Sequence, residues 1–491
     1  MVNISGGVRP LAIAIASVLL AACAVGPNHV RPAMDVPEHF VRVEADANTA
    51  ATNTVAVSPD SEFWRGFNDP ELTRLVERAL FANHDLRIAL ANLDRANALL
   101  RGAKFDYLPT ITAQGQASDN RASADQLPGV ARDDRDYQSY SVNAQASWEL
   151  DLFGRVRRSV EAQRAGLQAS ASDLQALQVA IVGEVANTYV GLRGAQERLR
   201  VARQNADNQA QTLQLVEARF NAGRGTEFDT SRARAQLETT RSRVPALEAQ
   251  VAVAMHRLAV LTGRTPDTLI TELTPLQPLP VLPARIDPST PGELLRHRPD
   301  VAAAEERLHA ATARIGVATA DLFPRFTLGG LIGSQAGTTG ALFSRDSETH
   351  LVALGIDWSF LDVGRVRARI KAADADAAGQ LAQYEKTVLL ALEDTENALV
   401  RHARARDEDG HLEQAALDSA KAAQLARLRY HAGATDLFEV LDAERTQLQA
   451  EDAFADARTR SVGSAIALYK ALAGGWPERM PERKKLASRS Q

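Results

Sequence analysis

Two long stretches without a proline constrain the fold of this chain more than any other feature of its sequence. They run from Arg155 to Asn221 and from Arg365 to His431, and they are equal in length. With a rise of 1.5 Å per residue, a continuous helix of this length spans roughly 100 Å. That is about three times the hydrocarbon core of a bilayer, and far longer than an ordinary globular helix. We therefore predict an elongated helical conduit rather than a compact enzyme domain.

The two stretches are near copies of each other. A Gly-Arg-Val-Arg signature opens both, at Gly154 and at Gly364. The closing signatures have the same separation along the chain as the opening ones. They are Arg219-Phe220-Asn221-Ala222-Gly223 and Arg429-Tyr430-His431-Ala432-Gly433. Further upstream, Pro109 matches Pro324 with a slightly larger offset. The pattern predicts an internal tandem duplication, so that one repeated architecture accounts for all 491 residues.

Composition and charge argue against several classes of function. The net charge is −5 and the Lys and Arg residues are spread along the chain, so we expect no nucleic-acid binding. The mean hydropathy is −0.21, and no run of about 18 apolar residues follows the N-terminus, which argues against a helical-bundle membrane protein. The histidines are scattered, and no Gly-rich phosphate loop or nucleophile elbow occurs. We expect no metal, no cofactor and no enzymatic activity.

The N-terminus reads as an export signal. Residues 1–22 contain a short apolar core and end in Leu20-Ala21-Ala22, directly before Cys23, the only cysteine of the chain. This tetrapeptide resembles the bacterial lipobox, which implies cleavage before Cys23 and lipidation of its thiol. Ala24 follows in place of the Asp that marks inner-membrane retention, so the sorting rule favours the outer membrane. The alternative is a plain signal peptide with an unrelated cysteine.

Four segments alternate between apolar and polar residues with the period of a strand: Thr110–Gln116, Tyr140–Trp148, Phe326–Gly333 and His350–Phe360. We predict four strands in two hairpins, each strand near the length that a tilted transmembrane strand needs. Small polar residues on one face suit a wall with lipid outside and water inside. A small soluble sheet is the alternative. Since four strands cannot close a barrel and open edges are not tolerated in lipid, several chains must share one barrel, and three copies would supply twelve strands.

The remaining segments complete the predicted organisation. A helical run begins at Asp69-Pro70 and ends near Leu108, its copy runs from Gly292 to Phe323, and Pro245 should break the helix that returns after Gly223. The predicted N-terminal parts are a signal peptide (1–22) and a lipidated linker (23–62), which we expect to be extended or poorly ordered. A first repeat (63–263, with a β-hairpin at about 110–150 and a helical hairpin at 155–262) is followed by a Pro-rich linker (264–291). A second repeat (292–475, with a β-hairpin at about 326–361 and a helical hairpin at 365–473) and a tail (476–491) complete the chain.

Three motifs resemble those of outer-membrane efflux proteins of the TolC/OprM type, particularly the NodT-like lipoprotein branch. They are Cys23-Ala24-Val25-Gly26-Pro27-Asn28, the stretch from Phe63 to Leu72, and Trp148-Glu149-Leu150-Asp151-Leu152-Phe153-Gly154-Arg155. The resemblance covers nearly the whole chain up to Trp476. It implies a mainly α trimer with a small transmembrane β part, namely a 12-stranded outer-membrane β-barrel and a 12-helix periplasmic α-barrel.

The resemblance also implies a function. The chain is expected to be the exit duct of a tripartite efflux pump, anchored by lipid in the outer membrane of a Gram-negative bacterium and extending into the periplasm. Its partners would be two further copies of itself, a periplasmic adaptor, an inner-membrane transporter of the RND type and outer-membrane lipid. The cargo would be small toxic compounds or drugs. Two rivals are the exit duct of a type I protein secretion system and a periplasmic coiled-coil scaffold, although a scaffold does not explain the four alternating segments.

The ends of the two long stretches are candidate binding sites. Gly223 and Gly433 suit the left-handed geometry that ends a helix, so the chain should turn there. The resemblance adds that these helix tips contact the adaptor. The residues that it assigns to this contact are Arg219, Phe220, Gly223, Thr226, Arg429, Tyr430 and Gly433. Alternatively, they only turn the chain.

Carboxylates follow each tip. The resemblance assigns the periplasmic gate to Asp229, Glu439 and Asp442. Such carboxylates from three chains would form a ring that favours cations. The alternative is that they stabilise helix N-termini through the macrodipole. A basic residue that some members carry after the second tip is absent here, and we expect Arg219 or Arg224 to substitute for it.

Overall fold

The computed structural model describes residues 24–41, 62–281, 290–473 and Pro481. The predicted signal peptide, the lipidation site Cys23 and nearly all of the predicted tail lie outside these residues. The chain divides into two compact units, which we describe separately. Unit 1 comprises Met1–Ala33, Asn92–Ala171 and Ala303–Glu385, and unit 2 comprises Met34–Ala91, Ser172–Ala302 and Lys386–Gln491.

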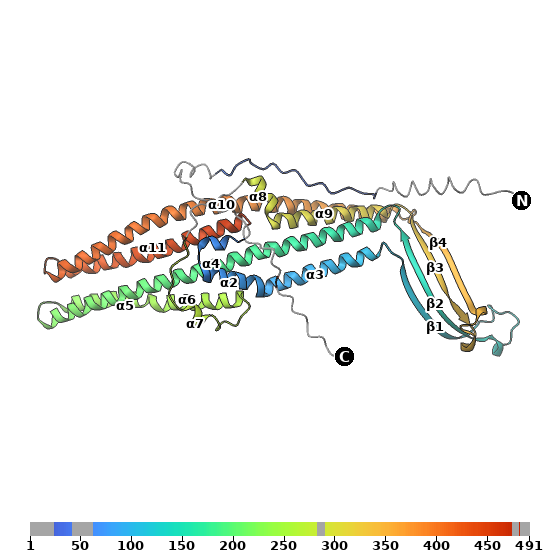
Figure 1. The fold of residues 1–491 in the computed structure, drawn as a ribbon, viewed down its shortest axis with the longest axis horizontal. Helices are drawn as coiled ribbons and strands as arrows, with labels where there is room; N and C mark the ends of the chain where they lie inside the picture. The colour runs from blue at the N-terminus through green and yellow to red at the C-terminus, as the bar shows by residue number, and fades with distance from the viewer. Residues whose placement is uncertain (1–23, 42–61, 282–289, 474–480, 482–491) are drawn as a thin grey trace. The chain divides into compact units, whose positions relative to one another are not determined.

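Unit 1 contains one antiparallel sheet of four strands in the order β1-β2-β3-β4 (Figure 1). The strands are β1 (Thr110–Arg121), β2 (Asp136–Leu150), β3 (Arg325–Ala336) and β4 (Glu348–Asp357). The four predicted strands are confirmed, and the pairing of β2 with β3 joins the two predicted hairpins into one sheet. The predicted end of the last strand at Phe360 is wrong. The ladder ends where Asp357 meets Arg325, because Pro324 has no N–H to continue it.

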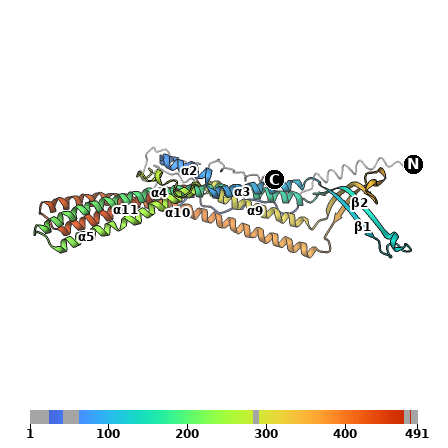
Figure 2. The same ribbon diagram turned by 90° about the horizontal axis from the view of Figure 1, so that it is seen from below.

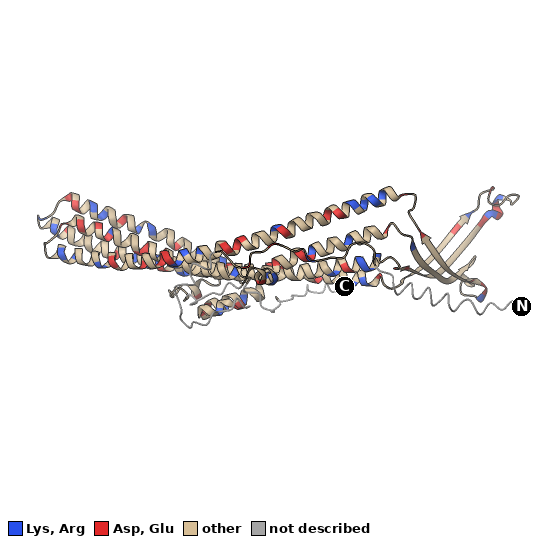
Figure 3. Cartoon of the chain, turned by 90° about the horizontal axis from the view of Figure 1, so that it is seen from above, with Lys and Arg blue, Asp and Glu red and all other residues tan. Residues whose placement is uncertain are grey.

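The register of the sheet separates its side chains into two faces. Rows such as Leu150–Phe326–Ile356 and Trp148–Leu328–Leu354 collect apolar side chains on one face. The rows between them carry small or polar residues on the other face, except for Leu331 and Leu351. We call the first the apolar face. Its apolar residues include Ile111, Ala113, Val142, Ala144, Ala146, Trp148, Leu150, Phe326, Leu328, Ile332, Val352, Leu354 and Ile356, and Ser334, Glu348 and His350 lie on the same face. The strands are free of charge along most of their length, whereas charged residues occur along the helices (Figure 3).

Both tryptophans at the helical end of the sheet are fixed in the same way. The indole Nε1 of Trp148 donates to the carbonyl of Tyr107, and that of Trp358 donates to the carbonyl of Leu322, each at 3.1 Å. Both carbonyls belong to the short turns that follow the helices α3 (His84–Phe105) and α9 (Pro299–Ala320). Each tryptophan therefore ties the end of a helix to the sheet.

Residues 24–31 pack within unit 1. The N–H of Val25 donates to the carbonyl of Phe153 at 3.1 Å. The buried guanidinium of Arg158 donates to the carbonyls of Val25 and Gly26 and to Oδ1 of Asn28. Gly154, with a φ of +80°, leaves no room for a Cβ beside Ala24. This part of the predicted linker is therefore held by specific contacts.

Two helical hairpins run side by side in unit 2 (Figures 1 and 2). The first combines α4 (Arg155–Asn221) with α5 (Glu227–Arg241) and α6 (Arg243–Leu261), and the second combines α10 (Val363–His431) with α11 (Leu437–Ala471). Both α4 and α10 begin in unit 1. The helix α4 covers the residues for which a continuous helix is predicted.

The return helix breaks where proline predicts it. Pro245 has no N–H to donate to the carbonyl of Arg241, so α5 ends at Arg241 and α6 starts after Ser242. The stretch Glu227–Leu261 is long and apolar enough to cross a membrane, judged by length and composition alone. Its ion pairs Arg203–Glu248 and Arg257–Glu184 join it to α4. We therefore interpret it as one arm of the hairpin.

The helical runs expected at 69–108 and 292–323 are not continuous, which corrects the prediction. The first divides into α2 (Pro70–Ala82) and α3, and the second into α8 (Pro291–His297) and α9. Asn83 ends α2 in an extended conformation, and its Oδ1 accepts from the N–H of Asp85 at 2.9 Å, which caps α3. Arg298 occupies the corresponding position before Pro299. A further short helix, α7 (Ile270–Leu273), lies in the Pro-rich linker.

The core of unit 2 forms around the aromatic residues that follow the N-terminal linker. The short helix η1 (Phe63–Phe67) buries Phe63, Trp64 and Phe67, and the ring of Phe63 stacks on Tyr469 with centroids 4.8 Å apart. The hydroxyl of Tyr189 donates to Asp69 at 2.8 Å, and Asp69 also caps α2. The motif that begins at Phe63 therefore anchors α2 to α4 and α11.

Candidate functional site

The two hairpin turns close with the same backbone geometry. Gly223 and Gly433 have φ values of +70° and +73°. In the first turn the N–H of Arg224 donates to the carbonyl of Arg219 at 2.8 Å, and in the second Ala434 donates to Arg429 at the same distance. A Cβ would be strained at both glycines, because their φ lies in the left-handed region. The predicted tip residues all lie in or beside these turns.

The acidic residue of the first tip caps its own helix. Thr226 and Asp229 form a reciprocal capping box, in which Oγ1 of Thr226 accepts from the N–H of Asp229 and Oδ2 of Asp229 accepts from the N–H of Thr226 at 3.1 Å. In a single chain, Asp229 therefore acts as the alternative interpretation expects, by stabilising a helix N-terminus. Its half-buried carboxylate stabilises the start of α5.

The two acidic residues of the second tip do not cap their helix, but both accept hydrogen bonds from neighbours in the chain. Asp436 caps α11 by accepting from the N–H of Glu439 at 3.1 Å, and Glu439 itself accepts from the hydroxyl of Thr435. Asp442 accepts from Arg445. Glu439 and Asp442 lie on one face of α11, since they are three positions apart in the helix. Within the described residues, no hydrogen bond or ion pair joins either of them to Asp229.

Arg219 links the two tips. Its Nη2 donates to the carbonyl of Tyr430 at 2.8 Å, and its guanidinium lies 3.9 Å from the centroid of the Tyr430 ring. Tyr430 is buried together with Val216, Leu437 and Val440 in an apolar cluster between the hairpins. The side chain of Arg224 is exposed and makes no such link among the described residues. Of the two candidate arginines, Arg219 is the one placed to join the hairpins.

Arg219 is the last of four polar residues on α4 that are spaced seven residues apart. All four contact the second hairpin, so we call this row the seam. Its pairs are Arg198 with Asp452 at 2.7 Å, Asn205 with Glu451 at 2.8 Å, Thr212 with Glu444 at 2.8 Å, and Arg219 with the carbonyl of Tyr430. A heptad position that is polar throughout specifies register and reduces stability. The apolar positions of α4 do not predict the seam, whereas the spacing of seven between its polar residues is visible in the sequence.

The seam contains buried polar groups without full partners. Glu444 is only 1% exposed, its Oε2 accepts no hydrogen bond, and Nη1 of Arg427 lies 3.8 Å from its Oε1. Burial raises the pKa of Glu444. Beside the seam on α4, between Asn205 and Thr212, the side-chain amide of Gln209 is also buried, and neither its nitrogen nor its oxygen has a partner. Since unpaired buried polar groups are unfavourable, the contact between the hairpins is weaker than an apolar one of equal area.

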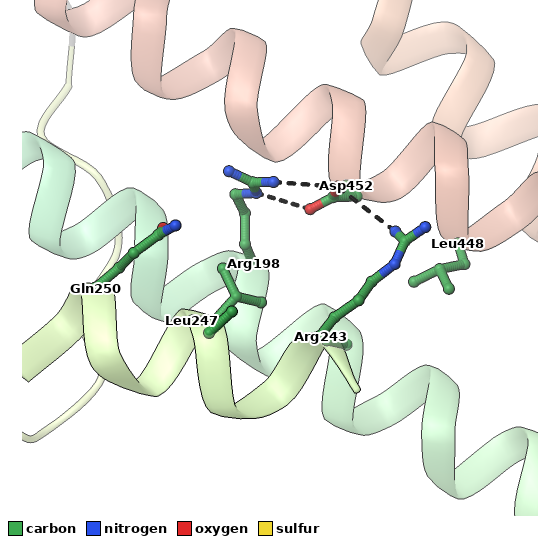
Figure 4. A pocket seen from close by; sticks show the side chains of 8 residues that line it. Arg198, Arg243, Leu247, Gln250, Leu448 and Asp452 are labelled. Carbon is green, nitrogen blue, oxygen red and sulfur yellow. Dashed lines mark hydrogen bonds and ion pairs between the residues drawn. The ribbon is translucent and has the colours of Figure 1, made fainter. Parts of the chain in front are cut away.

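An ion-pair cluster joins three helices beside the break at Ser242. Asp452 of α11 accepts from Arg198 of α4 at 2.7 Å and lies 3.8 Å from Arg243 of α6 (Figure 4). The three side chains border a pocket of about 350 Å³. Because both guanidiniums use the same carboxylate, Asp452 holds both arms of the first hairpin against the second.

Exposed aromatic side chains surround both tips. Phe228 is 70% exposed, and Phe220 and Phe438 are also exposed. The guanidinium of Arg232 lies 4.6 Å from the centroid of Phe438. Clustered exposed aromatic residues indicate a surface that binds a partner. Within the described residues, no group of three or more His, Cys, Asp or Glu side chains is arranged to hold a metal ion.

These features define a class of protein. A sheet with one apolar and one polar face, together with long helical hairpins and exposed aromatic tips, is the architecture of a channel that crosses an outer membrane. The chain belongs to the outer membrane efflux protein family, whose model matches residues 75–264 and 290–474.

Individual relatives agree with this assignment. The chain is 35% identical over 437 residues to the pyoverdine export outer membrane protein OpmQ of Pseudomonas putida. The aligned residues cover 87% of this chain and 90% of the relative. It is 30% identical over 443 residues to nodulation protein T of Rhizobium leguminosarum bv. trifolii, and the aligned residues cover 88% of this chain and 90% of that relative. The structure of the outer-membrane channel OprN superimposes with a TM-score of 0.84 at 40% identity, covering 92% of this chain and all of that one.

The family confirms the predicted function and location. The protein is an outer-membrane channel of a tripartite efflux pump, and it lies in the outer membrane of a Gram-negative bacterium and extends into the periplasm. The resemblance to the NodT-type branch is likewise confirmed. Members of this family are channels and not enzymes. The rival interpretation as a periplasmic scaffold is therefore wrong.

Proposed function

We propose that three copies of this chain form one continuous duct, with a 12-stranded β-barrel in the membrane and a 12-helix barrel in the periplasm. The observation that carries this proposal is the open sheet, in which β1 and β4 are both edge strands. Open edges are not tolerated in lipid, and four strands are too few to close a barrel. Pairing β4 of one copy with β1 of the next removes every edge.

The two repeats, 63–263 and 292–475, derive in this proposal from a tandem duplication. Equivalent contacts support it. Asn83 donates to the carbonyl of Leu261 at 3.0 Å, and Arg298 donates to the carbonyl of Ala471 at 2.9 Å. The two donors occupy matching positions in the two halves, directly before α3 and α9, and the two acceptors end the matching helices α6 and α11.

The helix tips bind the periplasmic adaptor, which connects the duct to an RND-type transporter in the inner membrane. The contact residues are Arg219, Phe220, Gly223 and Thr226 of the first tip and Arg429, Tyr430 and Gly433 of the second. Their exposed aromatic neighbours support this assignment. The relative OpmQ is named as an exporter of pyoverdine. For this channel we propose small toxic compounds or drugs as cargo.

The gate of the duct combines two elements. Asp229, Glu439 and Asp442 of three chains form an acidic ring at the periplasmic end, and the seam between the hairpins separates when the gate opens. Polar seam contacts can exchange with water more readily than an apolar contact, which supports opening at this place. The gate variant Glu439→Gln with Asp442→Asn should lower the cation preference of single channels, measured as a reversal potential in a salt gradient. Unchanged selectivity would remove these residues from the ring.

Cys23 carries acyl chains that anchor each copy in the outer membrane. The packing of residues 24–31 within unit 1 supports this proposal, because it would fix the position of an anchor attached just before them. The Cys23→Ser variant should yield a mature N-terminal peptide without the mass of the acyl chains.

Native mass spectrometry of the detergent-extracted protein tests the assembly. We expect the mass of three chains, together with a conductance in planar bilayers. A monomer that stays in solution without detergent would overturn the shared barrel.

A further inference from the structure

The loop between β3 and β4 forms a pocket on the apolar face of the sheet. The pocket has a volume of about 620 Å³. Its floor is a row of residues that cross all four strands: Ala113, Ala144, Ile332 and His350 are paired in register. The two alanines make the floor low, while Phe343 of the loop forms the opposite wall.

Hydrogen bonds hold the loop over the face. Oγ of Ser334 donates to the carbonyl of Leu342 at 2.9 Å, and Oγ of the buried Ser347 donates to the carbonyl of Ala341 at 2.8 Å. Between them, the side chain of Phe343 is 81% exposed. The loop therefore presents an apolar side chain outwards from a fixed backbone.

The surroundings of the apolar face restrict what can enter this pocket. In the proposed barrel, neighbouring copies pair with the edges β1 and β4 and leave the faces of the sheet uncovered. The polar face lines the water-filled duct, so the apolar face lies against lipid. A pocket on this face is thus continuous with the lipid-covered surface, and its volume is within the usual range of about 300–1,000 Å³ for ligand sites.

We propose that this pocket binds an acyl chain of a membrane lipid, one for each copy of the channel. This inference rests on the proposed function, since it requires the barrel. The helices enter the sheet at the end where Leu150 precedes α4, whereas the loop that covers the pocket joins β3 to β4 at the other end of these two strands, toward the outer surface. Glu348, Ser344 and His350 line the pocket close to the loop and provide polar contacts for the lipid headgroup.

Two matched substitutions on β2 test this proposal. Ala144 lines the pocket, whereas Ala146 lies two residues away on the same apolar face, opposite Ile111 and Gly330. Full-length native protein and the variants Ala144→Phe and Ala146→Phe are incorporated into phospholipid vesicles with and without lipopolysaccharide. Each protein is then extracted and washed in detergent, and the lipid retained per chain is counted by mass spectrometry.

We expect the native protein and Ala146→Phe to retain lipid equally. In Ala144→Phe the retained lipid should fall roughly tenfold, because the Phe side chain fills the space for acyl carbons. Equal retention by all three proteins, equal loss in both variants, or no lipid on the native protein would each overturn the site. Retention only in vesicles with lipopolysaccharide would identify that lipid as the source. Retention in both types of vesicle would show that the pocket accepts the acyl chain of a phospholipid as well.

The subunit mass and bilayer conductance of the same preparations separate the two proposals. A conducting trimer without specific lipid retention would remove the lipid site and keep the channel. A protein that neither assembles nor conducts would remove the barrel, and the lipid site with it.

Discussion

The first and second halves of the chain end their returning helices with the same backbone but with different side chains. After α6, Gly263 adopts a φ of +72°, and after α11, Ala473 adopts a φ of +60°. The last carbonyl of α6 accepts from the neutral amide of Asn83, whereas that of α11 accepts from the charged Arg298. The comparison shows that the position of each contact is preserved while its chemistry is not. At this position the second half also carries backbone strain that the first avoids.

The largest difference should appear when the two donors are removed. Arg298→Ala leaves the carbonyl of Ala471 with only the 3.4 Å hydrogen bond from Thr395 and takes the charged partner from Asp300, which should destabilise the protein by about 3 kcal/mol. Asn83→Ala removes neutral hydrogen bonds only, and should destabilise it by about 2 kcal/mol. Unfolding in detergent, followed by circular dichroism, measures both. If Asn83→Ala proves the more damaging, the charged contact is not the stronger one.

A smaller effect is expected where the halves meet at the tips. Arg219→Ala removes a hydrogen bond and a cation–π contact to Tyr430, together about 1.5 kcal/mol. If this contact holds the gate closed, the open probability in bilayers should rise roughly tenfold. Arg224→Ala is the matched control, since its side chain makes no link to the second tip among the described residues. Equal behaviour of the two variants would argue against Arg219 as the link.

The strain at Ala473 provides a third test. Ala473→Gly should stabilise the protein by about 1 kcal/mol, because glycine adopts a positive φ without a steric penalty. The reverse change in the first half, Gly263→Ala, should destabilise it, since a Cβ there would lie 2.6 Å from the carbonyl oxygen of Ala82. Melting temperatures of both variants, compared with the native protein, decide whether the second half is the strained one. A lower melting temperature for Ala473→Gly contradicts the prediction.

The smallest effect should be a dependence of the seam on pH. Burial raises the pKa of Glu444 in the folded state, so its charged form destabilises the fold at neutral pH. As the pH falls through this raised pKa, Glu444 takes up a proton, and the seam should become more stable and the channel should open less. Glu444→Gln should flatten this part of the pH profile, measured as open probability between neutral and mildly acidic pH. An unchanged profile would assign the dependence to another group.

The sequence predicts the long helices and the strands well because local patterns specify them. Proline-free stretches, the glycines of the tips and Pro245 each act within a few residues. The break at Asn83 was not expected, because the residues on both sides form helix and no proline follows. In the second half Pro299 marks the same break, and comparison of the halves would have located it.

The sequence alone determined the two long helices, the places where the helical hairpins turn and the alternation of the strands. Only the tertiary structure decided which residues meet: Arg219 with Tyr430, Glu444 with Thr212, and Ala113 with His350 in one row of the sheet. The physical reason is distance along the chain. Each of these contacts joins a segment of the first repeat to one of the second, so it depends on the register between helices or strands, which no local pattern specifies.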